Sequence, residues 1–307
     1  MLSLTIYHLP FTTNFMASLL DMRRRIKSVK NTQQITKAMK MVAAAKLKRA
    51  QDRVTAARPF AQKMSQVLGN LSARVGDDFS SPLLTERGDE NYLIVLVSAD
   101  KGLAGAFNAN IIKATQAFVK DRGAGKQMQM IPVGRKGRDF FKRREMRLTE
   151  EYVGLTGSGN VNHSDAIEIA QKLIKTFTED ETIDKVFLVF TEFKTVMSQK
   201  PVIEQLLPIP RTAVETDTAG TAQAEYIYEQ PAAEIFNRLL PKQVETQIYR
   251  AMLESTASEQ GSRMTAMDSA SKNAGELIDT LTLNMNRIRQ AAITKEIIEV
   301  VSGAAAQ

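Results

Sequence analysis

Residues 264–292 read MTAMDSASKNAGELIDTLTLNMNRIRQAA, and this stretch decides the fold. Its apolar and small residues recur at steps of three or four, at Met264, Met267, Ala270, Ala274, Leu277, Leu281, Met285, Ile288 and Ala292. A mean step of 3.5 residues is typical of a helix that pairs with another in a left-handed coiled coil. We therefore expect a long helix here that packs along a second helix.

Long helical patterns lie at both ends of the chain, at residues 17–73 and 231–303. At 1.5 Å per residue, two such helices would span about 85 and about 110 Å, more than a compact domain of this size could bury. Helices of this length must pack against each other or lie inside a partner protein. Pro241 allows two starts for the second helix, either at Pro231 with a kink or near Lys242.

Short side chains dominate residues 255–271, where Ala, Ser, Thr and Met prevail. Two helix backbones could approach closely along such a stretch. Gly261 and Gly275 should each cost about 1 kcal/mol of helix stability relative to Ala, and close packing would compensate for that cost.

The middle of the chain alternates strand-like and helix-like segments. Apolar runs predict strands at 92–98, 128–133 and 186–192, with 196–207 pairing antiparallel to the last of them. Helices are expected at 109–120, 137–144 and 165–178, the last with Asp165 and Glu168 as a cap pair. This alternation predicts a Rossmann-like open α/β domain between the two long helices.

The expected domains are an extension at 1–15, an N-terminal coiled-coil helix at 16–75, a linker at 76–90, an α/β domain at 91–230 and a C-terminal coiled-coil helix at 231–307. Residues 1–15 contain no Lys or Arg, so they fit neither a secretory signal nor a mitochondrial presequence. Either Met16 is the natural start, or the extension is a disordered tail. No run approaches 18 uninterrupted apolar residues, so we expect no membrane span.

The charge is concentrated near the N-terminus. The net charge is +7, yet residues 17–59 alone carry twelve Lys or Arg against Asp21 and Asp52. Three interpretations fit this local excess: a solvated helix face, a nucleic-acid surface or a site for an acidic protein partner. The nucleic-acid interpretation gains little, because no aromatic residue interrupts the basic stretch.

Candidate chemistry is sparse. The absence of Cys excludes disulfides, thiolate metal sites and cysteine nucleophiles, and His8 and His163 are the only histidines. Residues 98–108, SADKGLAGAFN, form a glycine turn between a strand and a helix, which can present N–H groups to a phosphate. The turn lacks the spacing of a P-loop or a dinucleotide fingerprint, so a tight turn whose Asp100 and Asn108 bond local backbone is favoured over a nucleotide site at 100–105. We predict no catalytic residue, cofactor or metal site.

Two terminal segments and this turn resemble a known family. Residues 21–46, DMRRRIKSVKNTQQITKAMKMVAAAK, resemble the N-terminal helix of the γ subunit of F-type ATP synthase, and residues 286–304, NRIRQAAITKEIIEVVSGA, resemble its C-terminal tip. Residues 98–108 resemble the family's S-D-[KR]-G-L-C-G-x-F-N turn, with Ala99 as an additional residue and Ala104 in place of Cys. The resemblance covers residues 16–305.

The resemblance implies a non-catalytic rotor: an antiparallel coiled coil of the terminal helices that turns inside a ring of α and β subunits, while β carries out catalysis. It implies that proton flow through a c-ring is coupled to ATP synthesis or hydrolysis. It places the chain, as a peripheral subunit, on the cytoplasmic side of a bacterial inner membrane, with the mitochondrial matrix face as the alternative. Without an inserted Cys pair, the thiol control of chloroplast γ subunits cannot operate.

Residue roles follow from the same resemblance. The residues expected to contact the α/β ring are Met39, Lys46, Arg49, Arg263, Arg289, Gln290, Thr294 and Glu299. Tyr226, Tyr228 and Glu229 match the foot segment that meets ε and the c-ring. Two other classes of function stay open on the residues alone. One is a basic coiled-coil nucleic-acid-binding protein, and the other is a nucleotide-using enzyme built around residues 100–105.

Overall fold

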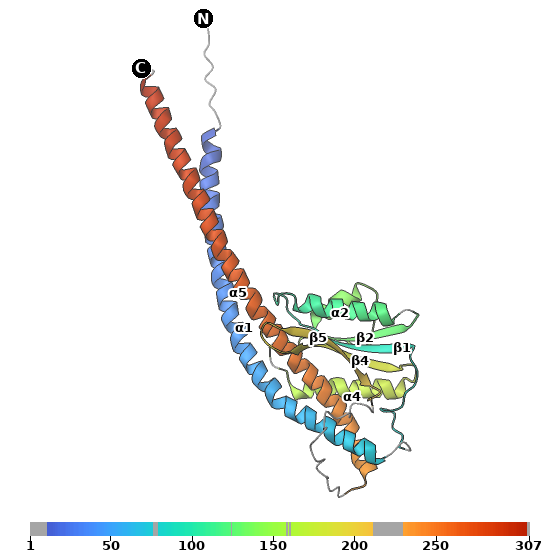
Figure 1. Ribbon diagram of the computed structural model, residues 1–307. Helices are drawn as coiled ribbons and strands as arrows, with labels where there is room; N and C mark the ends of the chain where they lie inside the picture. The colour runs from blue at the N-terminus through green and yellow to red at the C-terminus, as the bar shows by residue number, and fades with distance from the viewer. Residues whose placement is uncertain are drawn as a thin grey trace. The chain divides into compact units, whose positions relative to one another are not determined.

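The computed structural model describes residues 11–75, 79–123, 125–157, 159, 161–210 and 230–305, with side chains described from residue 19 onward except at 73. The chain divides into two compact units. The helical unit comprises residues 1–41 and 266–307, and the α/β unit comprises residues 42–265. Two helices, α1 (Phe11–Val75) and α5 (Ala232–Ala305), run through both units (Figure 1).

In the helical unit, α1 and α5 pair antiparallel. Gln33 donates a hydrogen bond to the Ser271 carbonyl at 3.3 Å, and Lys40 forms an ion pair with Asp268 at 2.6 Å. In this unit, partly or fully buried residues of α1 recur at steps of three and four, at Leu19, Met22, Ile26, Val29, Gln33, Thr36 and Lys40, and Met39 is partly buried beside them. The antiparallel coiled coil expected for the chain ends is therefore present.

The partner stripe on α5 agrees with the predicted spacing in most places. Met267 and Ala274 are buried, whereas Leu277 is 47% exposed. Gly275 lies where the helices approach closely, because a Cβ there would be 3.1 Å from Nε2 of Gln33. Close packing against α1 thus compensates for the helix stability that Gly275 costs, as expected.

The α/β unit is built on a five-stranded sheet in the order β3-β2-β1-β4-β5. The strands are β1 (Asn91–Val97), β2 (Gln127–Val133), β3 (Arg147–Leu148), β4 (Lys185–Phe193) and β5 (Gln199–Leu207). The first four are parallel, and β5 pairs antiparallel with β4. This confirms the Rossmann-like open α/β domain and the antiparallel last strand.

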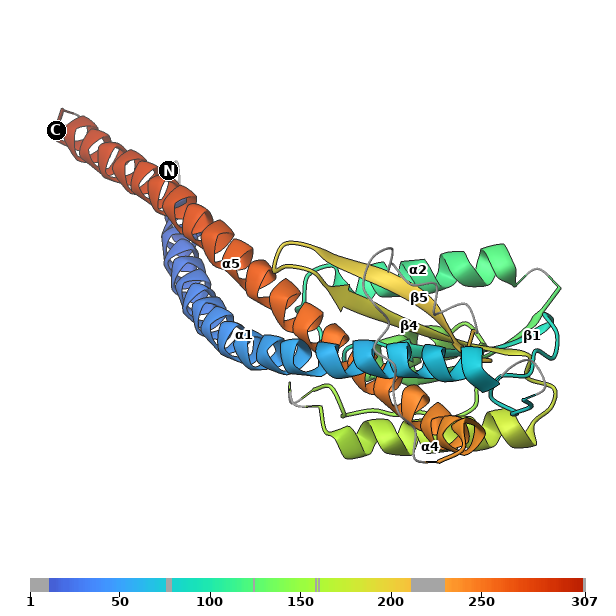
Figure 2. The same ribbon diagram turned by 60° about the horizontal axis from the view of Figure 1, so that its bottom comes forward.

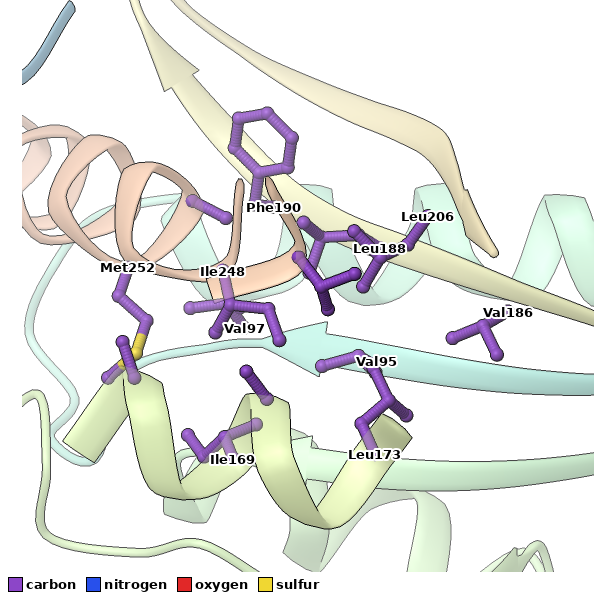
Figure 3. Packing of buried hydrophobic residues seen from close by; sticks show 14 of the residues in the cluster. Val95, Val97, Ile169, Leu173, Val186, Leu188, Phe190, Leu206, Ile248 and Met252 are labelled. Atoms are coloured by element: carbon purple, nitrogen blue, oxygen red, sulfur yellow. The ribbon is translucent and has the colours of Figure 1, made fainter. Parts of the chain in front are cut away.

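Helices cover both faces of the sheet. On one face lie α4 (His163–Glu179) and the parts of α1 and α5 that belong to this unit, and on the other lie α2 (Phe107–Arg122) and α3 (Arg135–Lys142) (Figures 1 and 2). Strand β1 is buried between them, so Val95 and Val97 join the first core while Ile94 and Leu96 join the second. Figure 3 shows the larger core, where α4, α5 and the sheet meet.

Three local predictions need correction. The Asp165–Glu168 cap pair is wrong, because α4 begins at His163 after Asn162, and Asp165 accepts hydrogen bonds within the first turn.

Helix α5 is continuous through Pro241 and begins at Ala232, so the later start near Lys242 is also wrong. The short side chains that begin at Ser255 first face the sheet rather than a helix, because Ser255 bonds the backbone of Thr191.

The segment before β1 packs into the α/β unit. Leu83 and Leu84 are buried, and the Leu83 carbonyl accepts a hydrogen bond from the Ile209 N–H at 2.8 Å. Within the described ranges, no helix combines the length and the apolar composition that crossing a membrane requires.

Candidate functional site

The turn after β1 is held by its own side chains. Asn108 accepts a hydrogen bond from the Ala99 N–H at 3.1 Å and donates one to the Lys101 carbonyl at 3.4 Å. This confirms the prediction that Asn108 bonds local backbone, whereas the same prediction for Asp100 is wrong, because its backbone partners are 35 to 57 residues away. The amide of Asn108 thus closes the turn at the start of α2.

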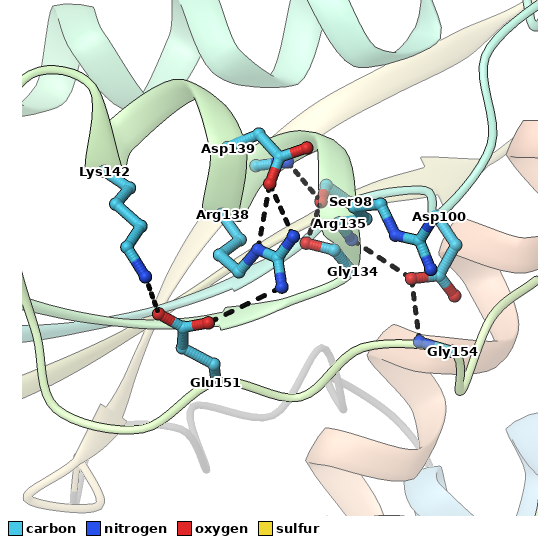
Figure 4. A network of polar contacts seen from close by, with 10 residues as sticks. Ser98, Asp100, Gly134, Arg135, Arg138, Asp139, Lys142, Glu151 and Gly154 are labelled. Carbon is cyan, nitrogen blue, oxygen red and sulfur yellow. Dashed lines mark hydrogen bonds and ion pairs between the residues drawn. The ribbon is translucent and has the colours of Figure 1, made fainter.

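Asp100 occupies an anion cradle. Its carboxylate accepts N–H groups from Arg135 at 3.1 Å and Gly154 at 2.9 Å (Figure 4). It also accepts the N–H groups of Thr156 at 3.1 Å and Gly157 at 2.9 Å, and the Thr156 hydroxyl at 3.0 Å. Converging backbone N–H groups, one of them in the first turn of α3, are the usual receptor for phosphate. Here the donors are already filled by a carboxylate of the same chain. This cradle, whose donors lie outside the turn of residues 98–108, is therefore occupied from within the chain.

The cradle keeps this carboxylate ionised. Burial by itself raises the pKa of Asp100, but hydrogen bonds from Gly154, Thr156 and Arg135 outweigh it and hold the pKa below its ordinary value. Nearby, Arg138 bonds Asp139 at 2.7 Å and lies 3.6 Å from Glu151, which also pairs with Lys142 (Figure 4). This second cluster satisfies its own charges on the α3 side of the sheet.

Arg263, a predicted ring-contact residue, lies buried beneath this turn. Its guanidinium donates to Glu259 at 2.7 Å and to the Gly102 carbonyl at 3.1 Å, and the residue is 9% exposed. Burial raises the pKa of Glu259, and Arg263 opposes that rise. Arg263 thus joins α5 to the β1–α2 turn.

Lys46 and Arg49 lie on α1 within the α/β unit. Lys46 is partly buried, and its Cδ would be 3.1 Å from a Cβ placed on Gly159. Arg49 is exposed. Of the predicted ring-contact residues in this unit, Arg49 is therefore the one most open to a partner.

The helical unit carries the basic face and Met39. Met39 is partly buried. Exposed cations crowd this part of α1 and form no ion pair within the described ranges: Arg23, Arg24, Arg25, Lys27, Lys30 and Lys37. A run of cations without local counter-charges suits a negatively charged partner surface.

The end of α5 is exposed on all sides. Arg289, Gln290, Thr294 and Glu299 are all exposed and belong to the helical unit. Large apolar side chains lie among them with 48–72% of their surface exposed: Ile293, Ile297, Ile298, Val300 and Val301. A contiguous exposed apolar surface indicates a place where another protein binds. The foot residues Tyr226, Tyr228 and Glu229 fall outside the described residues.

The ion pairs in the buried part of α5 escaped the sequence interpretation. Glu254 pairs with Arg58 at 2.9 Å and Glu259 pairs with Arg263, all within residues that are otherwise apolar or small. The available signal was two acids, five residues apart, inside a helix segment rich in Ala and Ser. Among the described residues, no group of three or more His, Asp or Glu is placed to hold a metal ion.

Comparisons with known proteins agree on one family. A family model described as ATP synthase matches residues 18–307. The ATP synthase gamma chain of Solibacter usitatus is 54% identical over 95% of this chain and 99% of its own length, and that of Heliobacterium modesticaldum is 51% identical over the same shares.

Solved structures agree as well. A chain from the central stalk and c-ring structure of Tetrahymena thermophila mitochondrial ATP synthase is 31% identical, with a TM-score of 0.57 over 77% of this chain and 99% of that chain. A chain from Euglena gracilis mitochondrial ATP synthase, 18% identical, shares the fold with a TM-score of 0.65 over 94% of both chains. The chain therefore belongs to the ATP synthase gamma-chain family, and its role is that of a central-stalk subunit.

Proposed function

We propose that this chain is the rotating shaft that transmits torque between a membrane c-ring and catalytic sites on β subunits, coupling proton flow to ATP synthesis or hydrolysis. The observation that carries this proposal is the exposed apolar end of α5, where Ile297, Ile298, Val300 and Val301 are 57–72% exposed on a two-helix rod. A rod of two helices has no interior for these side chains, so a surrounding protein must cover them. A ring of α and β subunits fits that requirement.

The proposed ring-contact residues form three groups. The polar side chains at the end of α5, Arg289, Gln290, Thr294 and Glu299, engage the ring at the tip of the shaft. Met39 and the exposed cations of α1 face acidic segments of β. Lys46, Arg49 and Arg263 lie in the α/β unit, where Arg49 is exposed and Arg263 is tied to Gly102. Arg263 therefore acts from inside the chain, and it would contact the ring only if a partner broke its hydrogen bond to Gly102.

The chain contributes no catalytic residue of its own in this proposal. Asp100 of the glycine turn fills an anion cradle with five hydrogen bonds, whose donors lie outside the turn, at Arg135 and at residues 154–157. Hydrolysis and synthesis then belong to the β subunits. The foot segment with Tyr226, Tyr228 and Glu229 meets ε and the c-ring, at the cytoplasmic face of a bacterial inner membrane.

The test is reconstitution of the full chain with α and β subunits. ATP hydrolysis by the complex, together with one-directional rotation of a bead fixed to the α/β unit, is the expected result. A folded chain that does not assemble with α and β, or a complex whose bead does not turn, would refute the shaft.

Met39→Lys tests the assignment of that residue. A new ammonium among cations that face β should lower proton pumping per ATP hydrolysed, while most of the helix pair survives. Met41→Lys is the matched control, because it adds the same charge two residues away at a side chain that is 63% exposed. Equal pumping ratios in wild type and Met39→Lys would remove Met39 from the interface.

A further inference from the structure

Strand β4 extends beyond its neighbour β1. The pairing of β1 with β4 ends at Leu96 and Val189, whereas β4 continues to Phe193 and pairs on its other side with β5 up to Gln199. The last residues of β4 therefore have a free edge on the side of β1. Thr191 and Phe193 on this edge are 3% and 7% exposed, so water does not satisfy their backbone groups.

Side chains from the two long helices pair with this edge. The Thr191 N–H donates to Oγ of Ser255 at 3.1 Å, and Oγ of Ser258 donates to the Thr191 carbonyl at 3.1 Å. The Phe193 N–H donates to Oε2 of Glu254 at 2.9 Å. These three residues lie on α5 and take the place of a neighbouring strand.

Arg58 of α1 completes the set. Its Nη2 donates to the Phe193 carbonyl at 2.9 Å, and its Nε and Nη2 donate to the two carboxylate oxygens of Glu254 at 3.0 and 3.1 Å. All four backbone groups of Thr191 and Phe193 thus have side-chain partners. We call the set of Arg58, Thr191, Phe193, Glu254, Ser255 and Ser258 the edge joint.

The edge joint is specific for one arrangement of its three elements. Glu254 has a side chain only 5% exposed, and a buried carboxylate is tolerated only when its oxygens are bonded. Its partners come from α1 and β4 at once, so a shift of the sheet along either helix would break charged hydrogen bonds. Apolar contacts are not directional and would tolerate such a shift. The joint therefore resists sliding in a way that the surrounding core cannot.

We propose that the edge joint is a torque-bearing connection, in which Arg58 and Glu254 are positioning residues that lock the sheet of the α/β unit to α1 and α5. This inference rests on the proposed shaft function, because a shaft that turns under load must pass force between its sheet and its helices without slipping. The joint carries that force through directional bonds to the backbone of β4.

The test measures torsional stiffness in the complex with α and β. The chain contains no Cys, so a single Lys113→Cys substitution on the exposed side of α2 gives one attachment point for a bead on the α/β unit. The readout is the variance of the bead's angle while rotation is paused. Hydrolysis without load is measured in parallel.

Glu254→Gln removes the charge that holds two of the four connections, so the joint should become about half as stiff and the angular variance should rise, by at most about twofold. Unloaded hydrolysis should not change. Arg58→Lys keeps the charge but loses the bidentate guanidinium contact with Glu254, and Ser258→Ala loses one hydrogen bond. Both variants should give smaller increases in the angular variance. These two milder variants decide the matter if Glu254→Gln does not assemble.

Arg138→Lys is the matched control. Arg138 pairs with Asp139 and Glu151 in the same unit but contacts neither α1 nor α5 through these bonds, so its variant should leave the variance unchanged. The charge-swapped pair Arg58→Glu with Glu254→Arg gives a second discrimination. It should not restore stiffness, because the Phe193 N–H needs a carboxylate and the Phe193 carbonyl needs a donor.

The outcomes separate the two proposals. If wild type does not rotate, the shaft function fails. If wild type rotates and Glu254→Gln, Arg58→Lys and Ser258→Ala all keep the wild-type variance, the edge joint is overturned while the shaft stands. Recovery of stiffness by the charge swap would show a simple ion pair and would also overturn the proposed connection to the backbone.

Discussion

Replacement of Asp100 by Ala should destabilise the loops at the C-terminal edge of the sheet. The loss of stability should exceed that caused by removing an equally large side chain from the surface. The side chain accepts five hydrogen bonds, and the residue is 7% exposed. Hydrogen bonds to a charged group contribute about 1.5–3 kcal/mol each, but Arg135 and Gly154 are exposed and can bond water after the change. Counting mainly the buried donors of Thr156, we expect a loss of about 3–5 kcal/mol in the free energy of unfolding.

Asp100→Asn should be almost as harmful as Asp100→Ala. Both carboxylate oxygens accept N–H groups, Oδ1 from Arg135 and Gly154 and Oδ2 from Thr156 and Gly157. In Asn, an NH2 group replaces one of these two oxygens. A side-chain donor would then face the backbone N–H donors that this oxygen accepts in the wild type. Urea unfolding of the full chain, followed by circular dichroism, measures both variants. Asp121→Ala is the control, because this aspartate of α2 is exposed and its removal should change stability by less than about 0.5 kcal/mol.

The lowered pKa of Asp100 determines how its contribution to stability changes with pH. The pKa of Asp100 lies below its ordinary value in the folded chain, so its contribution is complete above the unfolded pKa, which is about 3.9, and is lost as pH falls through the folded pKa. The stability gap between wild type and Asp100→Ala should be constant near neutral pH and should shrink in acid. An Asn variant within about 1 kcal/mol of wild type would refute the account of the cradle, because neutral amides then suffice.

Three further changes test other parts of the α/β unit by urea unfolding. Gly134→Ala should cost more than Gly154→Ala, because both have positive φ but a Cβ at 134 would lie 2.1 Å from the Ser98 carbonyl while none meets an atom within 4 Å at 154; equal losses would contradict this. Phe177→Ala should cost about 3–5 kcal/mol, because the ring is fully buried under the sheet, and a loss below about 1 kcal/mol would show that the core collapses around it. Arg263→Met should cost about 3–5 kcal/mol by leaving Glu259 buried without its partner, and adding Glu259→Met should recover part of that loss; an additive double variant would deny the coupling.

Much of the architecture could be predicted from local pattern. The 3.5-residue spacing from Met264 to Ala292 predicted a paired helix, and the apolar runs predicted four of the five strands to within a few residues, all but the two-residue β3. These features repeat over short distances, so each window of sequence carries its own signal. The cap of α4 was predicted incorrectly, because helix boundaries depend on a few backbone bonds that several nearby side chains could satisfy.

The candidate site was only partly predictable. The glycine turn suggested a phosphate cradle or a structural turn, and the choice depended on which groups come to Asp100. Those donors, at Arg135, Gly154, Thr156 and Gly157, are 35 to 57 residues away. Arg263 was assigned to a partner surface from its motif, yet it is 9% exposed and bonds Gly102. Exposure of a single side chain is decided by what packs over it, which no local pattern records.

The sequence by itself determined the elements, because helix and strand periods are properties of neighbouring residues, and it determined the basic face of α1, because charge is carried by composition. Only the tertiary structure decided how the buried polar residues are used. Arg58 and Glu254 are 196 residues apart, and Phe193 lies between them in the chain, yet the three share one set of hydrogen bonds. A buried charge must find partners wherever the fold brings them, so the role of Glu254 exists only after β4, α1 and α5 have come together.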